Sequence, residues 1–251
     1  MGNLDNLDVF FSVQSFQEEE LRGKTVVITD VLRATSTMVT AIKNGAKGII
    51  PVGDMGEASK IAQNVNSDNY LLCGEKNGLK IDGFDLGNSP FEYTHEKVGG
   101  KTLIFNTTNG TKAVKKSMSA DEVYIAAFLN LDRVVEVLRR STRDIILICS
   151  GWQGRLSLED LLLAGNIIYN LRDGIIDHHS SDGSKVALGL YEKFGNDLKN
   201  AIFHSNHAAR LKNIVGEEDI DYCCQLNITD VLPVLSQGII INHDSHVEKT
   251  E

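Results

Sequence analysis

Short apolar runs alternate with longer amphipathic stretches along the first 150 residues of the chain. The apolar runs are rich in Val and Ile and are bounded by polar residues or glycine, which is typical of β-strands. The runs at 26–29 and 145–148 are almost uninterrupted, as expected for strands that are covered on both faces. The pattern predicts strands over 7–13, 25–31, 47–52, 70–75, 102–108, 122–127 and 144–150.

Helical spacing of apolar residues fills many of the gaps between these strands. It is clearest over 35–45, 56–65, 111–118 and 131–141. Strands that alternate with helices are typical of a sheet with helices on both faces. We therefore expect an α/β fold, with a layered α/β/α body around a largely parallel or mixed sheet.

The regular alternation of strand and helix patterns ends after residue 154. Helices are predicted over 157–174, 186–195 and 201–215, and β-like patterns return at 221–227 and 238–243. With only 3 prolines in the chain and no Pro/Ser-rich linker, we expect a single unit over 1–251 whose C-terminal α/β part packs on the sheet. Two sub-lobes, about 1–150 and 151–251, are the alternative.

Charge and composition narrow the class of partner. The chain has 34 acidic and 25 basic residues and a net charge of -9, whereas nucleic-acid and membrane-surface binders usually carry basic patches. No apolar run approaches the roughly 20 residues of a membrane helix. The 4 cysteines form no CxxC pair, as is usual for free thiols in a reducing compartment. We expect a cytoplasmic protein that binds neither nucleic acid nor membrane, and a homodimer is compatible with its size.

Ligands of parallel α/β folds bind at the carboxyl ends of strands, and the first polar strand end here is TDVLRATST. Asp30 could bind Mg²⁺, which takes one or two carboxylates together with water and substrate oxygens. Arg33 could hold an anion through paired hydrogen bonds. Thr35, Ser36 and Thr37, at a helix start, suit a phosphate or carboxylate. The alternative is an ordinary Ser/Thr helix cap beside a solvated Asp and Arg.

The second polar strand end is NTTNGTK. Lys112 near a helix start is unfavourable to the helix dipole unless an anion lies nearby. A plain Asn-Gly turn with a capping Thr is the alternative. The candidate substrate-binding residues of this segment are Thr107, Thr108, Asn109, Gly110 and Thr111.

The third polar strand end, CSGWQGRLSLED, is a glycine-rich loop that leads into a helix. Its candidate substrate-binding residues are Gly151, Gly154 and Arg155. Glu159 and Asp160 could face a metal ion that Asp30 also touches. The alternative is a capping box in which Ser157 pairs with Asp160.

The same loop has the C-x5-R spacing of cysteine-dependent phosphatases, between Cys149 and Arg155. Ile148 stands where such enzymes usually have His, and Leu156 stands where Ser or Thr usually follows the Arg. Burial in an apolar strand would also raise the pKa of the thiol and oppose thiolate chemistry. The cysteine mechanism is therefore the secondary hypothesis.

Taken in order, TDVLRATST, GEKNGLKIDGFDLGNSP, NTTNGTKA and CSGWQGRLSLED resemble the 2-phosphosulfolactate phosphatase family. The resemblance covers nearly the whole chain. It implies a Mg²⁺-dependent phosphatase of coenzyme M biosynthesis, which converts 2-phospho-3-sulfolactate to 3-sulfolactate and phosphate. The implied partner is a small anionic phosphorylated substrate, and a related phosphorylated hydroxy acid would fit the same chemistry.

The resemblance draws four more residues into the candidate site. Glu75 and Asp85 become candidates for binding the metal or orienting water; without the resemblance, their segment would be a surface loop. His207 could protonate the leaving oxygen and Arg210 could hold a carboxylate or sulfonate. These two share one face of the predicted helix, and ordinary polar positions on an amphipathic helix are the alternative.

The combined hypothesis is Mg²⁺ held by Asp30 with Glu159 or Asp160, and transition-state charge neutralised by Arg33, Arg155 or Arg210. The nucleophile is either a water on the metal or Asp30 itself. A non-catalytic anion-binding protein on the same scaffold remains open. A nucleotide- or sugar-phosphate-binding enzyme is disfavoured, because no GxGxxG or GxxxxGK[ST] loop follows any strand.

Overall fold

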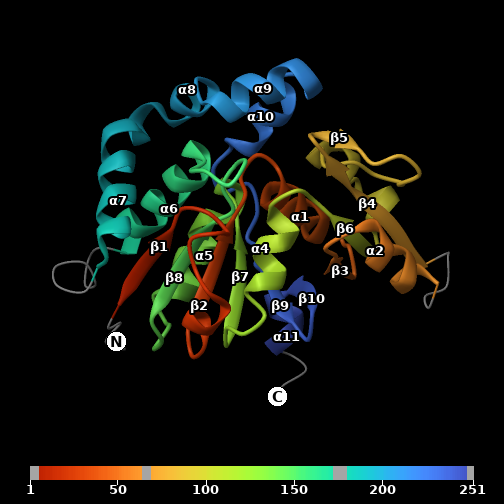
Figure 1. Ribbon diagram of the computed structural model, residues 1–251, viewed down its shortest axis with the longest axis horizontal. Helices are drawn as coiled ribbons and strands as arrows, with labels where there is room; N and C mark the ends of the chain where they lie inside the picture. Colours follow the sequence, from red (N-terminus) through yellow and green to blue (C-terminus); the bar gives the residue numbers. More distant parts are fainter. Residues whose placement is uncertain (1–5, 64–68, 172–179, 248–251) are drawn as a thin grey trace.

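The computed structural model describes residues 6–63, 69–171 and 180–247, and within them ten strands form one sheet (Figure 1). Its order is β1-β8-β2-β7-β9-β10-β3-β6-β4-β5. The strands, in sheet order, are β1 Leu7–Phe10, β8 Ile145–Cys149, β2 Thr25–Thr29, β7 Glu122–Ala126, β9 Pro233–Ser236, β10 Ile239–Asn242, β3 Gly48–Pro51, β6 Thr102–Asn106, β4 Tyr70–Lys76 and β5 Leu79–Lys80.

The sheet joins two parallel groups through an antiparallel hairpin. β1, β8, β2 and β7 pair in parallel, as do β3, β6 and β4, and β9 and β10 lie antiparallel between the groups. Because three antiparallel pairings separate the two groups, their strands would run in opposite directions in a flat sheet. The twist between neighbouring strands, roughly 20–25° at each step, accumulates to roughly 100–125° from β2 to β6 and reduces this difference in direction. The carboxyl ends of both groups therefore approach the same region.

Helices cover both faces of the first parallel group. Alternate residues of β2 and β8, such as Val27 and Leu147, belong to one core with α5 and α6, while Ile28 and Ile148 belong to a second core with α1 and α4. This layering confirms the predicted α/β fold class.

The longer described helices are α1 Ala34–Lys43, α2 Met55–Ala62, α4 Gly110–Lys116, α5 Leu131–Leu138, α6 Leu158–Leu171, α7 Asp182–Phe194 and α9 Asn206–Val215. The shorter α-helices are α3 His95–Val98, α8 Leu198–Phe203, α10 Glu218–Cys223 and α11 His243–Val247.

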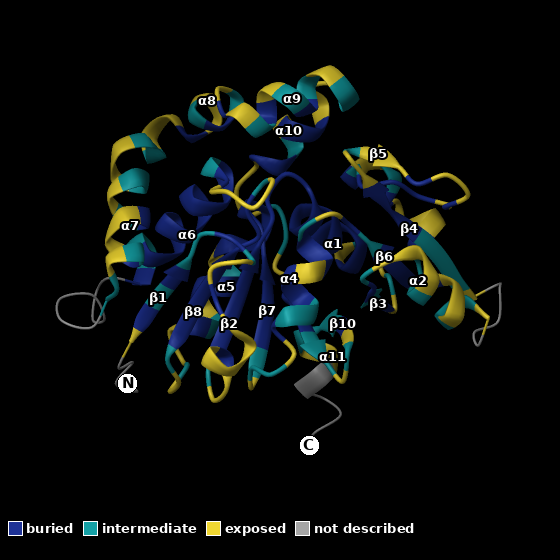
Figure 2. Cartoon of the chain, viewed as in Figure 1, coloured by how far each residue is buried: buried dark blue, intermediate teal, exposed yellow. Residues whose placement is uncertain are grey.

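The C-terminal part covers the sheet and also completes it. α8, α9 and α10 lie over the carboxyl ends of β1, β8, β2 and β7, with exposed outer surfaces on α7, α8 and α9 (Figures 1 and 2). β9 and β10 enter the sheet itself between β7 and β3. No helix in the described ranges is long and apolar enough to pass through a membrane.

Two segments differ from the sequence-based expectation, and a third is only partly described. The strand predicted over 221–227 is wrong: α10 occupies Glu218–Cys223, because Ile220 and Cys223 are spaced to share one buried helix face. The helix predicted over 201–215 is two helices, since the Ser205 hydroxyl caps the N–H of Ala208 and begins α9. The last three residues of the helix predicted over 157–174 lie outside the described ranges.

Candidate active site

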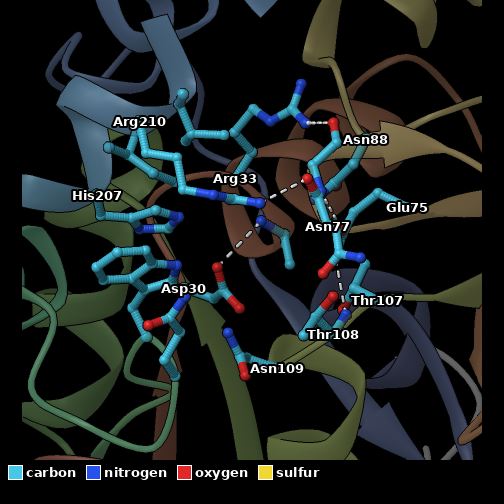
Figure 3. A pocket seen from close by; sticks show the side chains of 16 residues that line it. Asp30, Arg33, Glu75, Asn77, Asn88, Thr107, Thr108, Asn109, His207 and Arg210 are labelled. Carbon is cyan, nitrogen blue, oxygen red and sulfur yellow. Dashed lines mark hydrogen bonds between the residues drawn. The ribbon is translucent and has the colours of Figure 1, made fainter. Parts of the chain in front are cut away.

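A pocket lies where the loops after β2, β6 and β8 meet the β4–β5 turn and α9. Asp30 and His207 lie on one side of it, and Thr107 and Thr108 lie across from them (Figure 3). The pocket is lined by Asp30, Leu32, Arg33, Ala34, Glu75, Asn77, Gly78, Asn88, Thr107, Thr108, Asn109, Trp152, Gln153, His207, Arg210 and Leu211.

Gly110 allows the loops after β2 and β6 to touch. A Cβ at this position would lie 2.6 Å from the Cβ of Ala34 and 2.9 Å from Oδ2 of Asp30. Only glycine permits so close an approach without a shift of the backbone. Gly110 therefore shapes the pocket from behind and is not part of its lining.

Asp30 follows β2 and is 8% exposed. Within the described ranges its carboxylate forms no ion pair and accepts one long hydrogen bond, 3.4 Å from the N–H of Ala34. Burial raises the pKa of Asp30 to about 7, nearby carboxylates add to that shift, and His207 opposes it. This acid can therefore hold or release a proton near neutral pH, and no side-chain cation of the described residues pairs with it, although buried carboxylates are usually paired.

The three hydroxyls after Asp30 are buried and lie outside the pocket lining. Each bonds to a backbone group: Thr35 accepts from the N–H of Asp30 at 3.1 Å, Ser36 donates to the carbonyl of Val31 at 2.8 Å, and Thr37 donates to the carbonyl of Asn88 at 2.9 Å. They hold the shape of the loop, but none of them caps α1, whose N-cap residue is Arg33, and Asp30 and Arg33 are buried, so the capping alternative is wrong as well.

Arg33 lines the pocket, but its charge is already matched. Its guanidinium group is 3% exposed and donates to Oδ2 of Asp219 at 2.5 Å and to the carbonyl of Gly78 at 2.8 Å. Asp219 also accepts from the Ser89 hydroxyl at 2.7 Å. Removing one partner of such a buried pair typically costs about 3–5 kcal/mol, so Arg33 fastens α10 and the β4–β5 turn to the pocket.

Glu75 joins two of the loops around the pocket. Its Oε2 accepts from the N–H of Gly78 at 2.6 Å and its Oε1 accepts from the N–H of Thr108 at 2.7 Å. Both oxygens are thus engaged by backbone donors, although the side chain lies in the lining.

In the loop after β6, Thr107 and Thr111 bond to each other. The Thr107 hydroxyl accepts from the N–H of Thr111 at 3.0 Å, and the N–H of Thr107 donates to the Thr111 hydroxyl at 3.1 Å. Thr107, Thr108 and Asn109 face the pocket, and Thr111 is buried behind them.

Asp160 lies beneath the pocket and connects two strand ends. Its carboxylate accepts from the N–H of Val31 at 2.8 Å and from that of Gly151 at 3.2 Å, so it does not form the capping box with Ser157. Burial, reinforced by neighbouring negative charges, raises the pKa of Asp160 well above its usual range.

The predicted metal-binding acids do not form one cluster. Asp30 and Glu75 line the pocket, whereas Asp160 and Glu159 do not. Asp85 is exposed and accepts from the N–H of Leu72 at 2.8 Å, outside the pocket. Across the part of the chain that the structure covers, no group of three His, Cys, Asp or Glu side chains is arranged to hold a metal ion.

α9 brings His207 and Arg210 to the pocket. Nδ1 of His207 lies 2.6 Å from Oε1 of Glu159, and its ring stacks on Trp152 with 5.3 Å between ring centroids and 13° between ring planes. Arg210 is half-buried and donates to the carbonyl of Asn77 at 2.8 Å.

The glycine-rich loop after β8 makes a tight turn. Gly151 and Gly154 have φ of 71° and 72°, and a Cβ at Gly151 would lie 2.4 Å from the carbonyl oxygen of Arg155. The turn places Trp152 and Gln153 in the pocket lining. Arg155 is exposed and lines a neighbouring cavity instead.

Cys149 belongs to the core beneath this loop. It is 1% exposed, and burial, together with the charge of Asp160, raises the pKa of its thiol well above the usual range. The structure therefore offers no accessible thiolate next to Arg155. We expect Cys149→Ala to keep wild-type turnover and to lose about 1 kcal/mol of stability, as measured by phosphate release and thermal unfolding. Complete loss of turnover in a folded variant would restore the cysteine mechanism.

Comparison with known proteins shows the family of the chain. A family model described as 2-phosphosulpholactate phosphatase matches residues 10–238. The chain belongs to the 2-phosphosulfolactate phosphatase family. Relatives named "Probable 2-phosphosulfolactate phosphatase" include one from Caldanaerobacter subterraneus subsp. tengcongensis, 42% identical over 93% of this chain and 97% of the relative. Others come from Thermotoga petrophila (44% identical; 87% and 92% covered) and Clostridium novyi (38%; 90% and 95%).

Several pocket residues of this family member had no role in the sequence-based hypothesis. Asn77 and Gln153 line the pocket with φ of 58° and 53°, which is uncommon outside glycine. Asn88 is buried there, and its Oδ1 has no hydrogen-bond partner among the residues described. These residues and Trp152 all lie within the motifs that resemble the family, so their position in the motifs was the available signal.

Proposed function

We propose that this protein is a Mg²⁺-dependent phosphatase that hydrolyses the phosphomonoester of 2-phospho-3-sulfolactate, or of a related phosphorylated hydroxy acid. The products are the hydroxy acid, here 3-sulfolactate, and phosphate. Family membership indicates the phosphoric monoester hydrolase class. The observation that carries the proposal is Asp30, a buried pocket carboxylate with no ion pair within the described ranges.

The charge of the pocket supports a bound cation. Two carboxylates, Asp30 and Glu75, and two guanidinium groups, Arg33 and Arg210, lie in the lining, but Arg33 is already neutralised by Asp219. A substrate with phosphate, carboxylate and sulfonate groups would meet little net positive charge there. A divalent ion would supply the missing charge and would favour ionised Asp30.

The donor set fits Mg²⁺ in this role. Mg²⁺ commonly takes one or two carboxylates and completes its coordination with water and substrate phosphate oxygens. Asp30 would hold it, because both oxygens of Glu75 and of Asp160 already accept backbone hydrogen bonds. The ion would polarise the phosphoryl group and stabilise negative charge in the transition state.

The chain's own groups bind and orient the substrate. The guanidinium of Arg210 in the pocket lining suits the carboxylate or sulfonate, and Asn77, Thr108 and Asn109 add polar groups around the anion. His207 presents Nε2 as a proton donor for the leaving oxygen, since its Nδ1 is engaged by Glu159.

The physiological setting follows from the same proposal. It includes a cytoplasmic location and a role in coenzyme M biosynthesis. The location agrees with the four free, buried cysteines, because free thiols are usual in a reducing compartment.

A metal-dependent screen over phosphorylated hydroxy acids, with 2-phosphosulfolactate included, tests the proposal. We expect phosphate release with Mg²⁺ and its loss in EDTA. We also expect Mg²⁺ to raise the midpoint of thermal unfolding of the wild type at pH 8 and to leave that of Asp30→Asn unchanged. Hydrolysis that persists in EDTA, or equal stabilisation of both proteins, would contradict the metal assignment.

A further inference from the structure

Glu159 is the partner of His207 and lies outside the pocket. It is the second residue of α6, is fully buried, and places Oε1 2.6 Å from Nδ1 of His207. It lines a neighbouring cavity, where the Trp152–His207 stack forms a shared wall with the pocket. The hydrogen bond of this carboxylate therefore reaches the pocket through the imidazole ring, while its charge also acts on Asp30 at longer range.

This contact sets the tautomer of His207. An ionised carboxylate only accepts hydrogen bonds, so Nδ1 must carry the proton between the two side chains. Burial alone would raise the pKa of Glu159, but the hydrogen bond and the charge of His207 lower it below its ordinary value. Nε2 is consequently the ring atom left for the pocket.

Trp152 fixes the plane of the same ring. The two rings are nearly parallel, at 13°, with centroids 5.3 Å apart. Trp152 comes from the turn after β8, which Gly151 and its close contact with Arg155 hold in place. The imidazole is thus held at one ring nitrogen and across one face, and its side chain is only 12% exposed.

We propose that Glu159 is a positioning residue, which holds His207 with Nδ1 protonated and Nε2 directed at the leaving oxygen of the substrate. This inference rests on the proposed phosphatase function, and it replaces the earlier expectation that Glu159 binds the metal.

Water adds its oxygen to phosphorus and releases a proton to solvent, the P–O bond to the hydroxy acid breaks, and its electron pair stays on the leaving oxygen. Protonated His207 gives its Nε2 proton to that oxygen and becomes neutral. It keeps the Nδ1 proton on the hydrogen bond to Glu159, whose negative charge stabilises the protonated ring beforehand.

Two substitutions of Glu159 separate orientation from charge. Glu159→Gln keeps a carbonyl that can accept from Nδ1, whereas Glu159→Ala removes the acceptor. With ¹⁵N-labelled histidine at a pH that leaves the ring neutral, and His207→Asn to assign the signal, we expect the Nδ1–H tautomer of His207 in the wild type and Glu159→Gln and its loss in Glu159→Ala. With 2-phosphosulfolactate, kcat should fall about 100-fold in Glu159→Ala, with KM nearly unchanged and partial recovery in Glu159→Gln.

A double variant and a matched histidine complete the test. Glu159→Gln in the His207→Asn background should cause little further loss, because the hydrogen bond of Glu159 acts through the ring. His204→Asn, which changes a histidine that lines only the neighbouring cavity, should keep wild-type kinetics. If Glu159→Ala does not fold, the near-isosteric Glu159→Gln and the double variant still decide the question.

Three results would overturn the proposal. They are an unchanged His207 tautomer in Glu159→Ala, additive losses in the double variant, and loss of Mg²⁺-induced stabilisation in Glu159→Gln, which would make Glu159 a metal ligand. A wild type that hydrolyses none of the phosphorylated acids would refute the proposed function, whereas the tautomer measurement would still report on the positioning of His207.

Discussion

Asp30→Asn is expected to abolish phosphate release, with a loss of at least about 10³-fold in kcat/KM. Asp30 is the pocket carboxylate whose oxygens are not committed to strong backbone hydrogen bonds. Loss of the metal's charge stabilisation is typically worth several kcal/mol, and about 1.4 kcal/mol corresponds to each tenfold change in rate. Steady-state phosphate release with saturating Mg²⁺ measures the effect.

The same substitution should stabilise the metal-free protein above neutral pH. Because the folded-state pKa of Asp30 is raised from 3.8 to about 7, the folded protein binds the proton more tightly than the unfolded chain does. The free energy of unfolding therefore falls as pH rises from about 4 to 7, by at most about 4 kcal/mol, and then levels off. Asparagine does not titrate, so the variant should lack this decline.

Urea unfolding in EDTA between pH 4 and 8 tests that expectation. The two proteins should be similarly stable at pH 4, and the variant should be the more stable one at pH 8. Asp132→Asn, at an exposed position in the first turn of α5, is the matched control and should follow the wild type. Parallel stability curves for the wild type and Asp30→Asn would contradict this prediction, because they would mean that ionising Asp30 does not lower the free energy of unfolding.

The central strands could be predicted from sequence because they are buried on both faces. β2 and β8 read as continuous apolar runs for this reason, and the structure places alternate residues of each in two cores. β9, over Pro233–Ser236, has no such signal: it is short and begins with proline. Its place in the sheet depends on pairing with β7 and β10, which local sequence does not encode.

The sequence predicted where the candidate site lies but not which hydrogen bonds form within it. Polar strand ends located Asp30 and Thr107 at one pocket, although β2 and β6 belong to two parallel groups that an antiparallel hairpin separates. The backbone donors that engage Asp160 and Glu75 could not be predicted, because they depend on distant contacts. Asp160, for example, bonds to a residue 129 positions away. The sequence therefore suggested more free carboxylates than the folded pocket contains.

His207→Asn should lower kcat by about 10²- to 10⁴-fold, the usual contribution of a positioned proton donor, and change KM little. The loss should be largest for phosphorylated hydroxy acids, because their alkoxide leaving groups need a proton as the P–O bond breaks. With 4-nitrophenyl phosphate, whose leaving group departs without one, the loss should be much smaller. Asp30→Asn acts on the phosphoryl group itself, so it should lose activity on both kinds of substrate. Equal losses for both substrates in His207→Asn would instead mean that His207 binds the phosphate and does not protonate the leaving oxygen.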